Sequence, residues 1–166
     1  MIVLGIDPGL ATTGYGVLIS RGGKVKMLGL GVINTNPGEP VPLRLKILSD
    51  KLNILVNKYN PNIVVLEKIF FCKNVKTAMI IGEAIGAISV TCANLSIDIV
   101  EYTPLEIKQA IVGYGLATKA QMQKMLQRLL CLDEIPKPDD AADALAVALT
   151  HIYSYKLKKR IAQMTK

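Results

Sequence analysis

Four acidic residues occupy positions from which their carboxylates could converge. Asp7 and Glu67 each follow directly on a short apolar run with the composition of a buried β-strand. In open α/β sheets, ligand sites form at the carboxyl ends of such strands. Asp140 and Asp143 are three residues apart at the start of a predicted helix, so they project from one face of it. If the two strands are neighbours, we expect the four carboxylates to form one site.

A cluster of carboxylates suits the hydrolysis of phosphodiesters. Hard oxygen ligands bind Mg²⁺ or Mn²⁺, which neutralise the phosphate and activate water. Two-metal sites of this type hold their ions roughly 3.5–4 Å apart. Without a cation, four converging carboxylates would repel one another and raise each other's pKa.

Each acid also has a structural interpretation. Asp7, before Pro-Gly, could form an Asx-turn, and Glu67 could be a solvated strand end. Asp139 and Asp140 could cap a helix and complement its dipole. The distribution of charge favours the metal site, because five of the thirteen acids fall between residues 133 and 143 of a chain whose formal charge is +7. A basic chain of this kind favours polyanionic partners.

The order of predicted elements indicates an α/β fold with a mixed sheet and helices on both sides. The chain has 166 residues, 51% of them hydrophobic, which fits one domain. We assign residues 1–156 to this single domain and residues 157–166 to a basic C-terminal tail. The predicted strands are 2–6, 14–20, 24–33, 63–66 and 97–102, and the predicted helices are 43–59, 75–94, one opening at Thr103-Pro104, one capped by Thr118, and 141–155.

The cysteines and the apolar segments indicate a cytoplasmic protein that does not span a membrane. Cys72, Cys92 and Cys131 are dispersed and form no CxxC pair, which is typical of reduced thiols. The first residues lack the pattern of a signal peptide. The most apolar long segment, 78–100, contains Glu83, which a spanning helix would place inside lipid.

Five ordered blocks of residues resemble RuvC, the family of bacterial Holliday-junction resolvases. The resemblance runs from about residue 1 to 152, in the order and at the spacing of the family. The blocks are Gly5-Ile6-Asp7-Pro8-Gly9 with Thr13-Gly14-Tyr15-Gly16; Glu67-Lys68-Ile69-Phe70 with Lys73-Asn74; Thr103-Pro104 with Lys108-Gln109-Ala110; Gly113-Tyr114-Gly115 with Lys119-Ala120-Gln121; and Asp140-Ala141-Ala142-Asp143-Ala144-Leu145-Ala146.

The resemblance implies a ribonuclease-H-like fold with a mixed five-stranded sheet, a homodimer, and paired, Mg²⁺-dependent nicking of four-way DNA junctions during recombination and repair. It implies two Mg²⁺ ions per active site, with Mn²⁺ as a substitute, and RuvA and RuvB as branch-migration proteins on the same junction. It places the catalytic and metal-binding acids at Asp7, Glu67, Asp140 and Asp143, the catalytic lysines at Lys108 and Lys119, and DNA contacts at these two lysines and at Phe70, Phe71, Lys73 and Asn74.

Residue chemistry agrees with these assignments while leaving other roles open. Phe70 and Phe71 are the only phenylalanines and are adjacent, so in an extended segment one of them is exposed and could stack on an unpaired base. They could instead cover a hydrophobic gap. Lys108 and Lys119 flank the glycine break and could steady a phosphate, or they could be ordinary solvated lysines.

Glu83 and Ile85 depart from the family, where Gln and Arg are expected, and this puts in doubt any DNA contact from the helix that carries them. An apolar face on that helix, with Gly82 and Gly86 allowing close approach, suits a dimer interface. Three other functions are alternatives to this one. They are an RNA-processing nuclease of the same fold, a phosphotransferase or ATPase, which would need a longer chain, and a DNA-binding protein without catalysis.

Overall fold

One mixed sheet of five strands forms the centre of the molecule, in the order β3-β2-β1-β4-β5. The structure, a computed structural model, describes residues 1–68 and 74–164. The strands are β1 (Ile2–Asp7), β2 (Thr12–Arg21), β3 (Lys24–Asn34), β4 (Ile63–Glu67) and β5 (Ile99–Tyr102). The predicted α/β class and the five-stranded mixed sheet are therefore confirmed.

The central strand, β1, pairs with partners of opposite direction on its two sides. It runs antiparallel to β2 and parallel to β4, with Ile6 opposite Leu66 in the parallel register. Because β1 and β4 are parallel neighbours, their carboxyl ends meet at one edge of the sheet. This arrangement is the condition under which Asp7 and Glu67 were expected to lie side by side.

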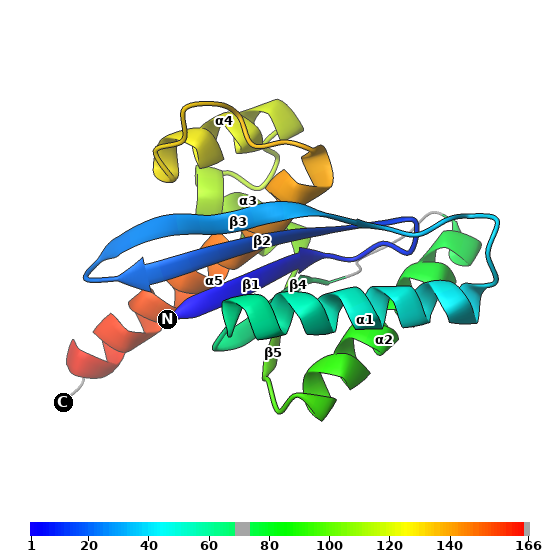
Figure 1. Ribbon diagram of the computed structural model, residues 1–166. Helices are drawn as coiled ribbons and strands as arrows, with labels where there is room; N and C mark the ends of the chain where they lie inside the picture. The colour runs from blue at the N-terminus through cyan, green and yellow to red at the C-terminus, as the bar shows by residue number, and fades with distance from the viewer. Residues whose placement is uncertain (69–73, 165–166) are drawn as a thin grey trace.

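Helices cover both faces of the sheet (Figure 1). In the described part of the chain they are α1 (Val41–Tyr59), α2 (Val75–Asn94), α3 (Pro104–Val112), α4 (Lys119–Leu129) and α5 (Asp139–Met164). The strands alternate in the faces that they bury. Leu4 and Leu66 belong to the hydrophobic cluster shared with α1 and α2, whereas Val3 and Val65 belong to the cluster shared with α3, α4 and α5.

Small residues allow α5 to lie directly against β1 and β2. A Cβ atom on Gly14 would overlap the backbone carbonyl oxygen of Asp140, and one on Gly5 would overlap that of Ala144. On the helix side, Ala141 and Ala144 are fully buried. Ala141 and Ala144 on the helix and Gly14 on the strand therefore let α5 pack tightly on the sheet.

Several element boundaries differ from the predicted ones; among them, β2 begins at Thr12, β3 ends at Asn34 and α1 begins at Val41. β5 begins at Ile99 rather than residue 97, because the N–H of Ile97 donates to the carbonyl of Cys92 in the turn after α2. Asp7 and Glu67 are the last residues of their strands rather than the residues after them. α5 continues from the predicted end at residue 155 to Met164, through a basic segment without glycine or proline.

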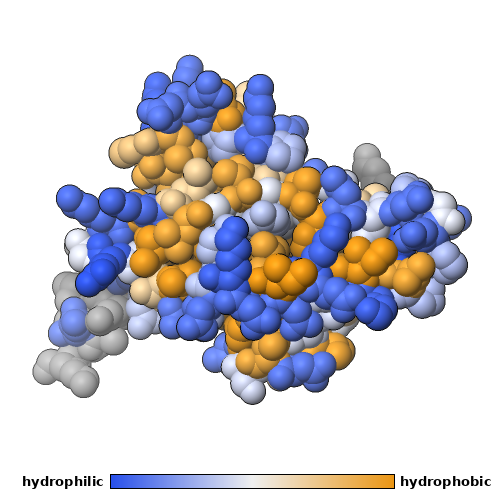
Figure 2. Space-filling view, viewed as in Figure 1, coloured by the Kyte–Doolittle hydropathy of each residue, from blue (hydrophilic) through white to orange (hydrophobic). Residues whose placement is uncertain are grey.

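Hydrophobic side chains reach the surface in separate patches between charged ones (Figure 2). On α2, the side chains of Val75, Met79 and Val90 are exposed to 73%, 64% and 62% of their full accessible area, and Ile54 of α1 is exposed to 64%. Scattered exposed apolar residues are normal, but three on one helix require an explanation.

Candidate active site

The first pair of acids lies where β1 and β4 end. Asp7 and Glu67 are the last residues of these adjacent parallel strands, and both side chains are half-buried. The turn that follows Asp7 is held by the hydroxyl of Thr13, which donates to the carbonyl of Gly9. The expectation that the two carboxylates emerge at one edge of the sheet is met by this topology.

The second pair lies in the first turn of α5. Asp140 and Asp143 are both half-buried, while the neighbouring Ala141 and Ala142 are fully buried against the sheet. The contact of Gly14 with the backbone of Asp140 brings this end of α5 next to the end of β1. The electrostatic influence of Asp140, Asp143 and Glu67 on Asp7 shows that the four acids gather in one region.

Two lysines reach this region from helices whose starts are well defined. Thr103 and Glu106 form a capping box that begins α3, which carries Lys108. Thr118 and Gln121 form a second capping box that begins α4 at Lys119. A pocket of about 200 Å³ lies between the helices and the sheet, and its lining includes Glu67, Lys108, Lys119 and Asp143, with Pro104, Ile107, Met122 and Ala146 forming its apolar walls.

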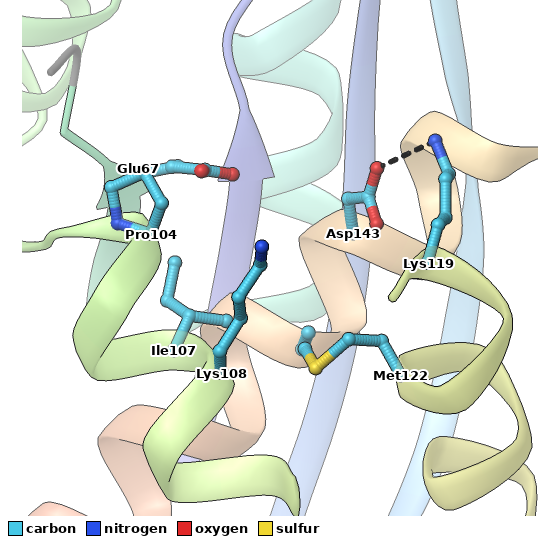
Figure 3. A pocket seen from close by; sticks show the side chains of 8 residues that line it. Glu67, Pro104, Ile107, Lys108, Lys119, Met122 and Asp143 are labelled. Atoms are coloured by element: carbon cyan, nitrogen blue, oxygen red, sulfur yellow. Dashed lines mark ion pairs between the residues drawn. The ribbon is translucent and has the colours of Figure 1, made fainter. Parts of the chain in front are cut away.

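Figure 3 shows how these charged groups face one another. The carboxylates of Glu67 and Asp143 lie on opposite sides of the pocket, and Lys108 extends from α3 into the space between them. Lys119 lies beyond Asp143 and is joined to it by an ion pair of 3.0 Å. Acidic and basic groups therefore alternate around a space that a phosphate could enter.

Burial and mutual repulsion raise the pKa values of three of the acids. Burial, followed by the charges of Glu67, Asp143 and Asp140, raises the pKa of Asp7 to about 7. Burial and then the charge of Asp143 raise the pKa of Glu67, against the opposing effects of Lys108 and Lys119. Burial also raises the pKa of Asp143, although Lys119 opposes that shift. Such perturbed carboxyl groups in a pocket are typical of functional sites.

Asp139 does not cap α5 as the sequence suggested. It is the first residue of the helix, and its side chain accepts a hydrogen bond from Gln123 Nε2 at 2.8 Å and pairs with Lys119 Nζ at 3.3 Å. The carbonyl of Pro138 instead accepts the N–H groups of Ala141 and Ala142. Asp139 therefore contacts α4 rather than the free N–H groups of its own helix.

The donor set of the four acids fits a divalent cation, although its side chains are not gathered around one point. Within residues 1–68 and 74–164, no three His, Cys, Asp or Glu side chains lie close enough to hold one ion together. The chemistry nevertheless agrees with such an ion: carboxylate oxygens are the ligands that Mg²⁺ and Mn²⁺ prefer. A cation would also relieve the repulsion that raises the pKa of Asp7.

Half of the predicted DNA-contacting residues fall outside the described part of the chain. Phe70, Phe71 and Lys73 lie in the segment 69–73, which the structure does not describe. Asn74 is described and caps α2, because its Oδ1 accepts the N–H groups of Lys76 and Thr77. Its contact with DNA remains a prediction.

Two parts of the site were missed by reasoning from the sequence. The apolar walls, among them Ile107 and Met122, carry only the helical periodicity of core residues. The sequence carries only a weak signal of the link between Gln123 and Asp139. Lys119 and Gln123 are four residues apart, and so are Asp139 and Asp143, so that each pair lies on one face of its helix. That signal becomes specific only when α4 and α5 are known to face each other.

Comparisons with known proteins agree with this site. The family described as "Crossover junction endodeoxyribonuclease RuvC" matches residues 3–151. A protein of that name from Caldicellulosiruptor saccharolyticus is 52% identical over 93% of this chain and 93% of its own length, and one from Natranaerobius thermophilus is 46% identical over 97% of this chain and 100% of its own. A structure described as Thermus thermophilus RuvC in complex with Holliday junction substrate superposes with a TM-score of 0.87 at 32% identity, covering 95% of this chain and 96% of that one. The ribonuclease-H-like form of the fold is thereby confirmed.

Proposed function

Since the chain belongs to the RuvC family, we propose that this Holliday-junction-resolving endodeoxyribonuclease cuts DNA with Mg²⁺ held by Asp7, Glu67, Asp140 and Asp143. The use of a divalent metal follows from the family. The observation that carries the choice of residues is that two strand ends and one helix turn bring four acids into one region. Two of them, Glu67 and Asp143, line the pocket that Lys108 and Lys119 also line.

The four acids would hold two ions between the end of β1 and the first turn of α5. When bound there, Mg²⁺ supplies neutralisation of the phosphate charge and activation of the attacking water. Asp7, whose pKa is raised to about 7 by burial and by its acidic neighbours, would gain a counter-charge from a bound cation. Glu67 and Asp143 would orient the ions from opposite walls of the pocket (Figure 3).

Lys108 and Lys119 would act on the substrate rather than on the metal. Lys108 extends into the space between Glu67 and Asp143, where its ammonium group can donate to a non-bridging oxygen of the scissile phosphate. Preorganised donors of this kind stabilise charge that develops in the transition state. Lys119 lies on the opposite rim and must exchange its ion pair with Asp143 for the phosphate.

The four-way junction would be engaged beside this pocket. β4 ends at Glu67, and only Lys68 separates it in sequence from the segment 69–73, which contains Phe70, Phe71 and Lys73. We propose that Phe70 stacks on an unpaired base at the junction centre and that Lys73 and Asn74 contact the backbone.

The exposed face of α2 supports a homodimer. Val75, Met79 and Val90 lie along one side of this helix, and a Cβ atom on either Gly82 or Gly86 of the same side would meet no other atom within 4 Å. A second copy could therefore approach closely along this stripe. Two symmetry-related sites would fit paired nicking of a junction, whose arms are themselves related by symmetry.

By its length and its apolar composition alone, α2 could also cross a membrane. A dimer explains the exposed stripe without a membrane, because the opposite side of α2 packs in the core through Ala84, Ile88 and Cys92. We propose a cytoplasmic location for the protein, and we propose that RuvA and RuvB act on the same junction. We also propose that residues 157–166 form a basic tail that can contact DNA. α5 runs through most of that tail.

A substrate panel tests the proposed function. The protein is incubated with a four-way DNA junction, a linear duplex of the same sequence and an RNA hairpin, each with Mg²⁺ or with EDTA. We expect symmetric nicks in the junction alone, and only with Mg²⁺. Preferential cleavage of the RNA hairpin would instead support an RNA-processing nuclease, and cleavage in EDTA would exclude the metal mechanism.

A further inference from the structure

Lys119 is shared between two carboxylates of α5. Its Nζ lies 3.0 Å from Oδ2 of Asp143 and 3.3 Å from Oδ2 of Asp139. The two acids are four residues apart and thus occupy the same face of the helix. Asp143 faces the pocket, whereas Asp139 is not part of its lining and is 61% exposed. Lys119 therefore lies on the boundary between the pocket and solvent.

A second residue of α4 fixes the orientation of Asp139. Gln123 is four residues after Lys119, and its Nε2 donates to Oδ1 of Asp139 at 2.8 Å. With one oxygen engaged by Gln123, the other faces Lys119. The hydrogen bond and the ion pair together join α4 to the first turn of α5.

We propose that Asp139, oriented by Gln123, is a positioning residue: it gives Lys119 a second counter-charge, so that Lys119 can release Asp143 to a divalent cation. This inference rests on the proposed metal site, and it gives a role to Asp139 and Gln123, which the proposed mechanism does not otherwise use.

The reason is competition for one carboxylate. An ammonium group bound to Asp143 neutralises the charge that a cation would use and repels that cation. If Asp139 were absent, Asp143 would be the one acidic partner left to Lys119 among the described residues. With Asp139 in place, Lys119 can lose its contact with Asp143 and still keep a counter-charge at the rim of the site, near the place where the phosphate enters.

The test is a titration of the whole protein with Mg²⁺ alone, without DNA. The melting temperature is measured at each Mg²⁺ concentration. A ligand that binds the folded state raises this temperature. Asp139→Asn removes one of the two ion pairs of Lys119. From the usual strength of exposed ion pairs, we expect this variant to need about two- to fivefold more Mg²⁺ for a half-maximal rise in melting temperature. Gln123→Met, which changes no charge, is expected to act in the same direction by about twofold.

Two further variants separate positioning from a direct effect of charge. Asp133→Asn removes an acid from the same region that makes no side-chain contact with Lys119, and should titrate like the wild type. In a Lys119→Met background, Asp139→Asn should no longer change the Mg²⁺ requirement, because the residue through which it acts is gone.

Three results would overturn the inference. It fails if Asp139→Asn and Gln123→Met both titrate like the wild type, or if the effect of Asp139→Asn persists in the Lys119→Met background. A rise in melting temperature that is the same in Asp7→Asn as in the wild type would instead refute the proposed metal site, and the inference with it. The metal-free melting temperature, recorded in each titration, identifies any variant that does not fold.

Discussion

Asp7 is the residue whose charge is most strongly opposed by its surroundings. Burial and the three neighbouring acids raise its pKa from 3.8 to about 7. At neutral pH and without a cation, the folded protein therefore holds an acid close to half protonated. A bound divalent cation would favour the ionised form, so metal binding and proton release are expected to be linked at this residue.

The raised pKa of Asp7 predicts how metal-free stability depends on pH. Below pH 3.8 Asp7 is protonated in both the folded and the unfolded chain, and its contribution to stability is fully present. Between pH 3.8 and about 7 the folded state retains a proton that the unfolded state has lost, so stability falls as pH rises. The slope is at most about 1.4 kcal/mol per pH unit.

Urea unfolding in EDTA at pH 5 and pH 8 checks this prediction. We expect the free energy of unfolding to fall less between the two values in Asp7→Asn than in the wild type, and the variant to be the more stable protein at pH 8. Groups remote from Asp7 titrate alike in both proteins and cancel in this comparison. Equal changes in wild type and variant would contradict the assigned pKa.

At the scale of elements, the site depends on how closely α5 approaches the sheet. Asp140 and Asp143 reach Asp7 because the backbone of α5 lies against Gly14 and Gly5, where no side chain intervenes. The placement of two of the proposed metal ligands is therefore determined by glycines, which carry no functional group.

Gly14→Ala should displace the first turn of α5. The added Cβ would overlap the carbonyl of Asp140, and backbone atoms cannot move aside as a flexible side chain can. We expect a loss of about 1–3 kcal/mol in the free energy of unfolding, as for other overpacked sites, together with a large loss of cleavage. Gly38→Ala, where a Cβ would make only ordinary contacts, is the matched control. Wild-type cleavage by Gly14→Ala would show that the position of Asp140 does not matter.

The stripe on α2 predicts the effect of a charge at its centre. Val90→Glu would place a carboxylate in the proposed dimer interface, where it would be buried without a partner. We expect light scattering at micromolar concentration to show a dimer for the wild type and a monomer for this variant. Ile54→Glu on α1 is the control, since Ile54 is equally exposed on a different helix and should leave the dimer intact. A monomeric wild type would refute the interface.

At the scale of the whole molecule, the sequence was most informative where local rules apply. The strand ends that carry Asp7 and Glu67, the capping boxes at Thr103 and Thr118, and the alanine face of α5 all follow from short patterns. The ion pairs of Lys119 do not, because they depend on how the connection between α4 and α5 orients two helices. Asp139 was misassigned for that reason: a local capping role was assumed where a contact between helices exists.

The most direct test of the four-carboxylate site compares binding and cleavage of one labelled four-way junction by the wild type and Asp7→Asn. With Mg²⁺ present, we expect the variant to lose more than about a hundredfold in cleavage rate, beyond the usual effect of removing an outer partner of a metal ligand. Its junction affinity, measured in Ca²⁺ or EDTA, should stay within a few-fold of the wild type. Cleavage retained by Asp7→Asn, or binding and cleavage lost together, would contradict the assignment of Asp7 as a metal ligand.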